Sequence, residues 1–312
     1  MKNMDFSSRK NKPIVVVGSL NMDLVMRVPR VPVGGETLHG HGFSTLPGGK
    51  GANQAVACAR LGAAVSMIGQ VGDDGFGPSL IAGLITDGID AEGVKRSATA
   101  GTGVAVILVE DAGQNRIMLD AGANGALTPA DIDACAATIE GAAMLVLQLE
   151  IAMPAIERAV AIAHAAGVPV LLNPGPAVPL PETLWPLIDL LIPNESEAAL
   201  LSGQRVDDLE DAKAAARSLR ARGVGIVLIT LGANGVLVAD DEGMRHLPAK
   251  VVEAVDTTAA GDTFIGGLAA GLLEGLTLDA AAMLGQQASA VCVTRRGAQP
   301  SIPYRHELPI TG

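Results

Sequence analysis

Short runs of almost uninterrupted apolar residues recur along the chain. They alternate with longer segments in which apolar positions lie three or four residues apart. The short runs predict strands at 14–17, 65–71, 144–149, 168–172, 190–192 and 226–231. The longer segments predict helices at 52–61, 151–166, 209–222, 264–273 and 278–293. Strands that are apolar at nearly every position are typical of a parallel sheet buried on both faces. The alternation therefore predicts a doubly wound α/β fold with helices on both faces of the sheet.

Two segments interrupt this alternation. Residues 23–47 contain short alternating stretches with Pro and Gly, and residues 102–120 are typical of a hairpin. Because neither has a helical period, we expect them to pair into one small sheet that covers a site at the strand ends as a lid. Residues 1–12 carry charges but no apolar core, which predicts a short mobile tail rather than a secretion signal.

The composition narrows the class of protein. Apolar residues make up 49% of the 312 residues and aromatic residues 2%, while 33 acidic residues against 22 basic ones give a net charge of −11. This balance argues against nucleic acid as a partner and against attraction to anionic membranes. No apolar run approaches the roughly 18 residues of a membrane span. The 3 widely separated cysteines fit a reducing compartment, so we expect a cytoplasmic protein.

Polar residues follow the predicted strands at the edge where α/β proteins bind their ligands. Asn21 and Asp23 come after the first strand, and Glu150 directly follows the end of the strand 144–149. The segment Gly48-Gly49-Lys50-Gly51-Ala52-Asn53 opens a helix but lacks the spacing of a triphosphate-binding loop. Amide and carboxylate groups that converge there would suit a neutral polyol. Asx-type turns and a simple glycine turn are the alternative interpretation.

The segment Asp256-Thr257-Thr258-Ala259-Ala260-Gly261-Asp262-Thr263 precedes an apolar helix. Small residues before a helix leave its first N–H groups accessible to an anion. Asp262 would then be a general base beside an anion hole, the pairing that phosphoryl transfer requires. The alternative is that Asp262 only stabilises the start of its helix through the helix dipole.

Two further segments fit a nucleotide site less specifically. Pro193-Asn194-Glu195-Ser196-Glu197 follows a strand, and its carboxylates would suit Mg²⁺ held through water, or would simply cap a helix. Thr230-Leu231-Gly232-Ala233-Asn234-Gly235 is either a plain turn or a glycine-lined wall for a nucleotide.

Together these segments resemble the ribokinase group of the phosphofructokinase-B-type family of sugar and nucleoside kinases. The resemblance covers about Pro13 to Glu307. It rests on eight segments in order: GSLNMD (18–23), GGKGANQA (48–55), VGDD (71–74), QLE (148–150), PNESE (193–197), TLGANG (230–235), DTTAAGDTF (256–264) and TRRGAQPS (294–301).

The resemblance implies a three-layer α/β/α domain over residues 13–312, interrupted by a β-sheet lid from about 22–47 and 102–120, and a homodimer through that lid. It implies the following site residues. The sugar would be held by Asn21, Asp23, Gly49, Lys50, Asn53 and Glu150. Asp262 would be the base, beside an anion hole of the backbone N–H groups of Ala259, Ala260, Gly261 and Asp262. ATP would bind at Asn194, at Thr230, Leu231, Gly232, Ala233, Asn234 and Gly235, at Gly261 and Asp262, and at Gln286, with Glu197 organising Mg²⁺ through water. A monovalent cation, usually K⁺, would lie at Asp256, Thr258, Cys292, Arg295, Gly297 and Ser301.

The implied reaction converts D-ribose and ATP to D-ribose 5-phosphate and ADP. A related kinase for 2-deoxyribose, another sugar or a nucleoside is the nearest alternative, and a non-catalytic sugar sensor is a remote one. A nucleoside kinase would need aromatic faces to stack a base, and the chain has few. The intact segment around Asp262 argues against a sensor.

Overall fold

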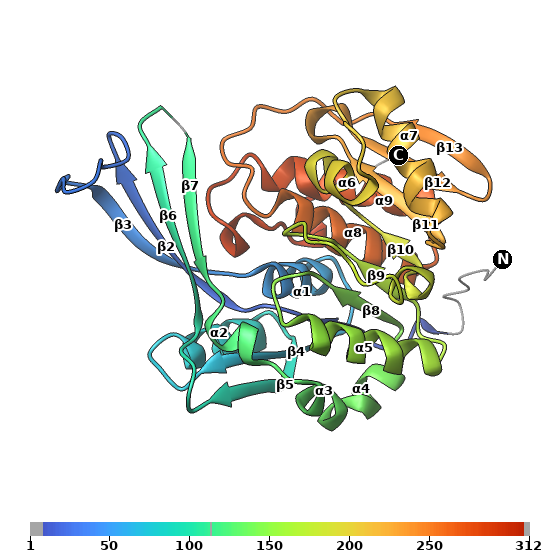
Figure 1. Cartoon of the computed structure of the whole chain (residues 1–312), viewed down its shortest axis with the longest axis horizontal. Coiled ribbons are helices and arrows are strands. Elements are labelled where there is room, and N and C mark those ends of the chain that lie inside the picture. Colours follow the sequence, from blue (N-terminus) through green and yellow to red (C-terminus); the bar gives the residue numbers. More distant parts are fainter. Residues whose placement is uncertain (1–8, 113, 309–312) are drawn as a thin grey trace.

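The computed structural model describes residues 9–112 and 114–308, which form a large sheet flanked by helices and a smaller sheet to one side of it (Figure 1). The larger sheet has nine strands in the order β13-β12-β11-β10-β9-β8-β1-β4-β5. Their bounds are β1 (Ile14–Val17), β4 (Val65–Gly72), β5 (Asp90–Ser97), β8 (Met144–Leu147), β9 (Val170–Leu172), β10 (Leu190–Leu191), β11 (Ile226–Thr230), β12 (Val236–Asp240) and β13 (Gly243–Leu247). Strands from β11 to β5 pair in parallel, and only the β11–β12 and β12–β13 pairs are antiparallel. The predicted mostly parallel sheet is therefore confirmed.

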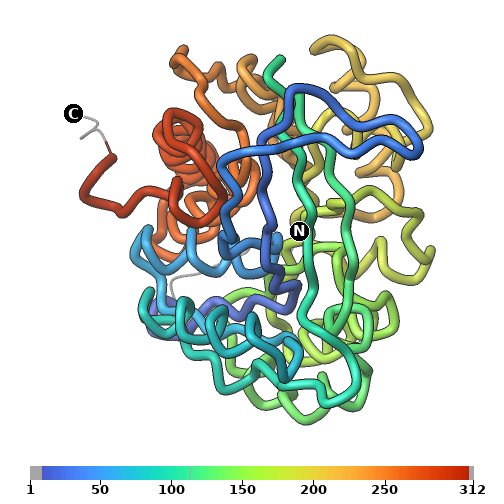
Figure 2. The backbone as a smooth tube through the Cα atoms, turned by 90° about the vertical axis from the view of Figure 1, so that its left-hand side faces the viewer, coloured from blue at the N-terminus to red at the C-terminus, as the bar shows by residue number. Residues whose placement is uncertain are grey.

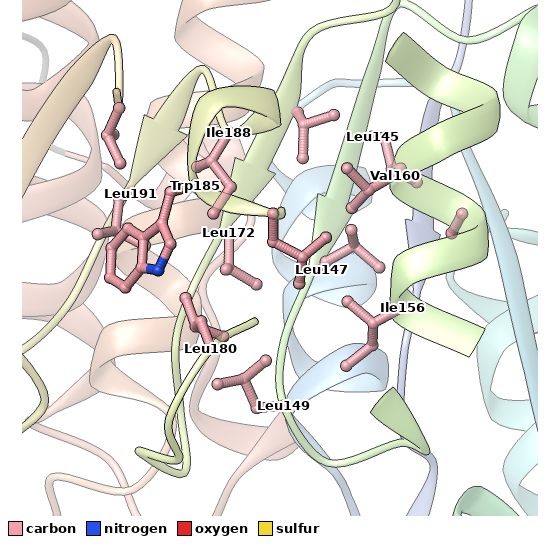
Figure 3. Packing of buried hydrophobic residues seen from close by; sticks show 14 of the residues in the cluster. Leu145, Leu147, Leu149, Ile156, Val160, Leu172, Leu180, Trp185, Ile188 and Leu191 are labelled. Carbon is pink, nitrogen blue, oxygen red and sulfur yellow. The ribbon is translucent and has the colours of Figure 1, made fainter. Parts of the chain in front are cut away.

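Helices cover both faces of this sheet because alternate residues of its strands point to opposite sides. Val15 and Val17 belong to the apolar cluster under α5 (Met153–Ala165) and α7 (Leu209–Ala221). Ile14 and Val16 belong to the cluster under α1 (Lys50–Arg60) and α8 (Ala260–Glu274). Figure 3 shows the first cluster, where Leu145 of β8 lies close to Val160 of α5. The helices are α1 (Lys50–Arg60), α2 (Gly77–Thr86), α3 (Pro129–Ala134), α4 (Ala136–Glu140), α5 (Met153–Ala165), α6 (Glu195–Ser202), α7 (Leu209–Ala221), α8 (Ala260–Glu274) and α9 (Leu278–Cys292). This three-layer arrangement confirms the predicted fold class.

The second sheet is built from the two segments that interrupt the α/β pattern. Its strands are β2 (Asn21–Val28), β3 (His41–Gly48), β6 (Gly103–Glu110) and β7 (Asn115–Asp120), in the order β3-β2-β6-β7. β2 pairs antiparallel with β3 and parallel with β6, which joins the two segments. Figure 2 shows these strands running together along one side of the molecule. We call β2, β3, β6 and β7 the lid sheet, although its closure over a ligand and the domain boundaries stay predictions.

The sequence predicts a mobile tail over residues 1–12. Residues 1–8 of it lie outside the described residues, and Arg9 donates hydrogen bonds to the carbonyl oxygens of Ala142 and Gly167. Within residues 9–112 and 114–308, no helix combines the length and the apolar character that crossing a bilayer requires.

Candidate active site

The carboxyl ends of the parallel strands meet at one edge of the large sheet, as the doubly wound topology dictates. A cleft of about 630 Å³ lies along this edge. It is bounded by the start of α6, the turn after β11 and the first turn of α8. The cleft is lined by eight residues predicted for the nucleotide site: Asn194, Thr230, Gly232, Ala233, Gly235, Gly261, Asp262 and Gln286. Leu231 and Asn234 line instead a neighbouring cavity of about 320 Å³, beside His246.

Asp262 lies in the first turn of α8, with only 6% of its surface exposed. Its Oδ2 accepts a hydrogen bond from Asn53 Nδ2 at 3.0 Å, and its Oδ1 accepts one from Gln54 Nε2 at 2.9 Å. Both donors lie on α1, so the carboxylate is held by a neighbouring helix. This geometry goes beyond the helix-stabilising role that was the alternative for Asp262.

The first turn of α8 faces the cleft beside this carboxylate. Ala259 has φ 59°, which lies in the left-handed region and starts the helix abruptly. The N–H groups of Gly261 and Asp262 belong to the first turn and have no acceptor within an α-helix. The N–H of Ala260 donates to Thr257 O at 3.2 Å, so it is already engaged. Gly261 and Asp262 are therefore the N–H groups of the predicted anion hole that are best placed to meet a charged oxygen.

Glu150 ties the glycine segment to the end of β1. Its Oε2 accepts hydrogen bonds from Ser19 Oγ at 2.5 Å and from the backbone N of Lys50 at 3.0 Å. Ser19 Oγ also accepts one from Gly51 N at 3.2 Å. Gly49 has φ 89°, and a Cβ placed there would lie 2.7 Å from Asn21 N, so only glycine fits. The predicted sugar-binding residues Gly49, Lys50 and Glu150 thus form one connected group.

Asn21 and Asp23 are buried where β1 continues into the lid sheet. Asn21 Oδ1 accepts a hydrogen bond from Asn124 Nδ2 at 2.7 Å, which leaves the Asn21 amide N–H groups for another acceptor. Burial together with the negative charges of Glu150 and Asp262 raises the pKa of Asp23 to about 7, and burial is the largest of these causes. This mutual influence places the three carboxylates Asp23, Glu150 and Asp262 around one site.

Lys50 connects this sugar-side group to the nucleotide cleft, which its side chain lines. Burial acts to lower its pKa, but the carboxylates of Asp262, Glu150 and Glu197 outweigh burial and raise it. A Cβ on Gly175 would lie 3.0 Å from Lys50 Cε and 2.8 Å from Glu197 Oε1. Because it has no side chain, Gly175 provides the space in which the Lys50 ammonium group and the Glu197 carboxylate lie together.

Asn194 and Glu197 form a reciprocal cap at the start of α6. Asn194 Oδ1 accepts from Glu197 N, and Glu197 Oε2 accepts from Asn194 N, at 2.8 and 2.9 Å. Asn194 and Glu197 therefore form the helix cap that was one of the two interpretations of this segment. Burial raises the pKa of Glu197, and the charge of Asp262 acts in the same direction. Across the described ranges, no group of three or more His, Cys, Asp or Glu side chains is arranged to hold a metal.

The residues predicted for a monovalent cation lie around the loop that precedes α8. Asp256 Oδ1 accepts from both N and Oγ1 of Thr258, and Oδ2 accepts from Gly297 N at 2.9 Å. Cys292 Sγ lies 3.6 Å from Thr258 O and 3.0 Å from Ser301 Oγ. Arg295 turns away from this group and pairs with Glu307 at 2.8 Å. Five of the six residues therefore gather at one place, and Arg295 contributes at most its backbone.

Several buried polar residues around the site were not identified from the sequence. They are Ser19, Gln54, Asn124, Gln148 and Asn173, each at most 8% exposed. Gln54 directly follows Asn53, Gln148 lies near the end of the predicted strand 144–149, and Asn173 directly follows the predicted strand 168–172, so position at a strand end or helix start was the available signal. Asn124 follows the lid sheet and has no such signal in the sequence.

Comparisons with known proteins agree with this geometry. The model of the pfkB family of carbohydrate kinases matches residues 11–305. A ribokinase of Schizosaccharomyces pombe is 47% identical over 305 residues, covering 95% of this chain and 96% of the relative. A ribokinase of Haemophilus influenzae is 43% identical, covering 95% and 97%. A deoxyribokinase of Salmonella typhi is 38% identical, covering 93% and 95%.

Solved structures show the same likeness. The structure of Arabidopsis thaliana ribokinase complexed with ribose and ATP superposes with a TM-score of 0.87. Its sequence is 33% identical, and the match covers 95% of this chain and 96% of that one. The predicted enzyme class, an ATP-dependent sugar kinase, is confirmed by these matches and by the family model. The chain belongs to the pfkB family of carbohydrate kinases.

Proposed function

We propose that this enzyme transfers the γ-phosphoryl group of ATP to the 5-hydroxyl of D-ribose, giving D-ribose 5-phosphate and ADP. The observation that carries this proposal is the position of Asp262. Its carboxylate contacts Asn53 on the sugar side, while its own helix turn lines the nucleotide cleft. One residue therefore stands where the two substrates meet.

In the proposed reaction, the 5-hydroxyl oxygen attacks the γ-phosphorus in line with the departing ADP oxygen. Asp262 takes the proton of that hydroxyl, a new O–P bond forms, and the bond from the γ-phosphorus to ADP breaks. The N–H groups of Gly261 and Asp262 and the α8 dipole stabilise the charge on the transferred group. Lys50, which lines the cleft and carries a raised pKa, supplies a positive charge there.

The sugar would lie among Asn21, Asp23, Asn53 and Glu150. These residues offer amide and carboxylate groups, which bind neighbouring hydroxyls of a neutral pentose well. Among the described residues, Asn53 Oδ1 is buried and lacks a hydrogen-bond partner, as expected of an acceptor waiting for a hydroxyl donor. This unsatisfied oxygen supports a polar ligand at this point.

We place Mg²⁺ and a monovalent cation at the residues predicted for them. Mg²⁺ retains several waters and binds nucleotide phosphates, so one buried carboxylate such as Glu197 suffices to orient its waters. When bound, Mg²⁺ neutralises phosphate charge. The loop of Asp256 and Thr258 brings the Asp256 carboxylate and the Thr258 carbonyl oxygen to one place, and oxygen ligands of this kind suit K⁺. The ordered loop would hold the start of α8 in place.

A homodimer through the lid sheet is part of this proposal. β3 and β7 expose large apolar side chains: Phe43 is 60%, Ile117 63% and Met118 58% exposed. Such side chains on a small sheet favour a protein partner. Sedimentation of the purified protein distinguishes a dimer from a monomer. We also propose that the enzyme works in the cytoplasm, in keeping with its free cysteines.

The second candidate substrate is 2-deoxyribose, because a deoxyribokinase is among the relatives. The experiment that decides is ADP release with ribose, 2-deoxyribose, fructose and adenosine, each with ATP and Mg²⁺. We expect the highest kcat/KM with ribose. A higher value for another sugar would reassign the substrate within the same family. Absence of ADP release with every acceptor would refute the kinase proposal itself.

A further inference from the structure

Gln54 on α1 is fully buried, and its side-chain amide is completely engaged. Nε2 donates to Asp262 Oδ1 at 2.9 Å and to Asn173 Oδ1 at 3.1 Å. Oε1 accepts from Gln148 Nε2 at 2.6 Å. Both amide hydrogens and the carbonyl oxygen of one side chain thus join α1 to the ends of β8 and β9 and to the start of α8.

The orientation of this amide follows from its partners. A carboxylate only accepts hydrogen bonds, so Gln54 must turn Nε2 toward Asp262. The other N–H then meets Asn173, whose own Nδ2 donates to Ile192 O at 2.9 Å. Asn173 also lines the nucleotide cleft. One amide group therefore fixes the carboxylate of Asp262 relative to a wall of that cleft.

The two oxygens of Asp262 differ in how firmly they are held. Oδ1 meets Gln54, whose amide cannot turn without losing three hydrogen bonds. Oδ2 meets Asn53, and Asn53 Oδ1 has no partner within the described residues, so that amide is free to adjust to a ligand. The arrangement holds one carboxylate oxygen rigidly and presents the other to the sugar side.

We propose that Gln54 is the positioning residue of the catalytic carboxylate: it holds Asp262 Oδ1 so that Oδ2 meets the attacking hydroxyl. This inference rests on the proposed function, in which Asp262 is the base. A base must lie within hydrogen-bond reach of the proton it takes. A displacement of about 1 Å in such a group costs on the order of 10²-fold in rate. Gln54 itself would not contact either substrate.

The chain offers a matched pair of variants for the test. Gln54→Met and Gln148→Met each replace a fully buried glutamine with a flexible side chain of similar length. Both remove the Gln148–Gln54 hydrogen bond, but only Gln54→Met also removes the bond to Asp262. The measurements are kcat, KM for the sugar, KM for ATP and the thermal unfolding midpoint. The wild-type protein is assayed with its best sugar from the acceptor panel.

For Gln54→Met we expect kcat to fall by roughly 10- to 100-fold, with both KM values within about threefold of wild type. For Gln148→Met we expect kcat within about threefold of wild type, although both variants lose stability. Equal losses of kcat in the two variants, or an unchanged kcat in Gln54→Met, would overturn the positioning role. Wild-type protein that is inactive toward every acceptor would instead refute the proposed function, and with it this inference.

A second variant keeps the test decisive if Gln54→Met does not fold. Gln54→Glu has the same shape, but its ionised form faces Asp262 without a donor, whereas its protonated form can donate to Oδ1. The ratio of its kcat to that of wild type should rise by roughly tenfold as the pH falls from about 8 to about 6. Asp23, whose pKa of about 7 lies in this range, and Lys50, Glu150 and Glu197 are common to both proteins, so the ratio isolates the introduced carboxyl. A ratio that does not change with pH would contradict the proposal.

Discussion

The side-chain amide of Asn124 donates to Asn21 Oδ1 at 2.7 Å, across 103 positions of sequence. The same amide donates to Leu20 O at 3.1 Å and accepts from Leu20 N at 2.9 Å. Residues 20–21 are where the chain leaves the large sheet for the lid sheet, and Asn124 lies in the turn by which it returns. One buried side chain therefore connects both crossings and orients a residue predicted to bind the sugar.

Replacing Asn124 tests this connection. Asn124→Leu removes three buried hydrogen bonds and leaves the backbone groups of Leu20 unpaired. We expect a loss of about 1–3 kcal/mol in unfolding free energy and a rise of roughly tenfold in KM for ribose. KM for ATP should change little, because Asn21 lies on the sugar side. Denaturant unfolding and steady-state kinetics measure both effects. An unchanged KM for ribose would show that Asn21 does not contribute to sugar binding.

Asp262→Asn tests the assignment of the base. The variant should fold, because Asn53 Oδ1 has no partner within the described residues and its amide can turn to accept the new N–H. We expect kcat to fall by roughly 10²-fold or more, since an amide cannot take the proton of the hydroxyl. Ribose binding, measured by calorimetry without ATP, should survive. Turnover close to that of wild type would show that another group acts as the base.

Within the large sheet, the strands that the sequence pattern revealed are those whose residues are buried on both sides. β1, β8 and β11 are continuous apolar runs because helices cover both of their faces, so the sequence pattern reveals them. β5 has mostly exposed or half-buried residues at the edge of the sheet, and its sequence contains no such run. In the large sheet, the pattern of continuous apolar runs therefore fails where burial is one-sided.

The candidate site was predictable where a residue type has an evident chemistry at a strand end or helix start. Asp262 and Glu150 met that condition. Gln54 and Asn124 did not, because their importance arises from partners that lie 208 and 103 positions away in the sequence. Such long-range amide contacts exist only once the fold has brought the elements together.

The raised pKa of Asp23 predicts a pH dependence of stability. Its pKa is about 7 in the folded protein, against 3.8 as the ordinary value, because burial and two neighbouring carboxylates disfavour its charge. The folded state therefore keeps a proton that the unfolded state has lost between these two values. The stability that this proton provides is complete below about pH 4 and is lost as the pH rises through about 7.

Asp23→Asn isolates this contribution. The amide does not ionise, so the unfolding free energy of the variant should decline less between about pH 5 and about pH 8 than that of wild type. The measurement is urea unfolding at several pH values, without sugar. The same variant should bind ribose more weakly, because it loses a charged acceptor. Parallel pH curves for the two proteins would show that Asp23 is not the group responsible.

From the loop around Asp256 we predict that the reaction rate depends on which monovalent cation is present. At constant ionic strength, we expect a higher rate in K⁺ than in Na⁺. Asp256→Asn should abolish the difference, because one amide N–H would face either Thr258 N or Gly297 N, and the loop would open. Initial rates in the two salts provide the measurement. Equal wild-type rates in K⁺ and Na⁺ would remove the cation from the proposed mechanism.

We expect replacement of glycine by alanine to have opposite effects on the unfolding free energy at two helical positions. A Cβ on Gly266 of α8 would lie 2.3 Å from Ala57 Cβ and 2.7 Å from Ala57 C, so α8 must move away from α1. These two helices carry Asp262 and Asn53. Gly266→Ala should therefore cost about 1–3 kcal/mol of unfolding free energy and also reduce kcat.

Gly83 of α2 is the control. Apart from its chain neighbours and the adjacent backbone of α2, a Cβ there would meet no described atom within 4 Å, and alanine is the better helix former. Gly83→Ala should raise the unfolding free energy by about 0.5–1 kcal/mol and leave kcat unchanged. Denaturant unfolding and kinetics of both variants provide the comparison. If Gly266→Ala kept full stability and activity, the close contact of α1 with α8 would not be what fixes the Asn53–Asp262 distance.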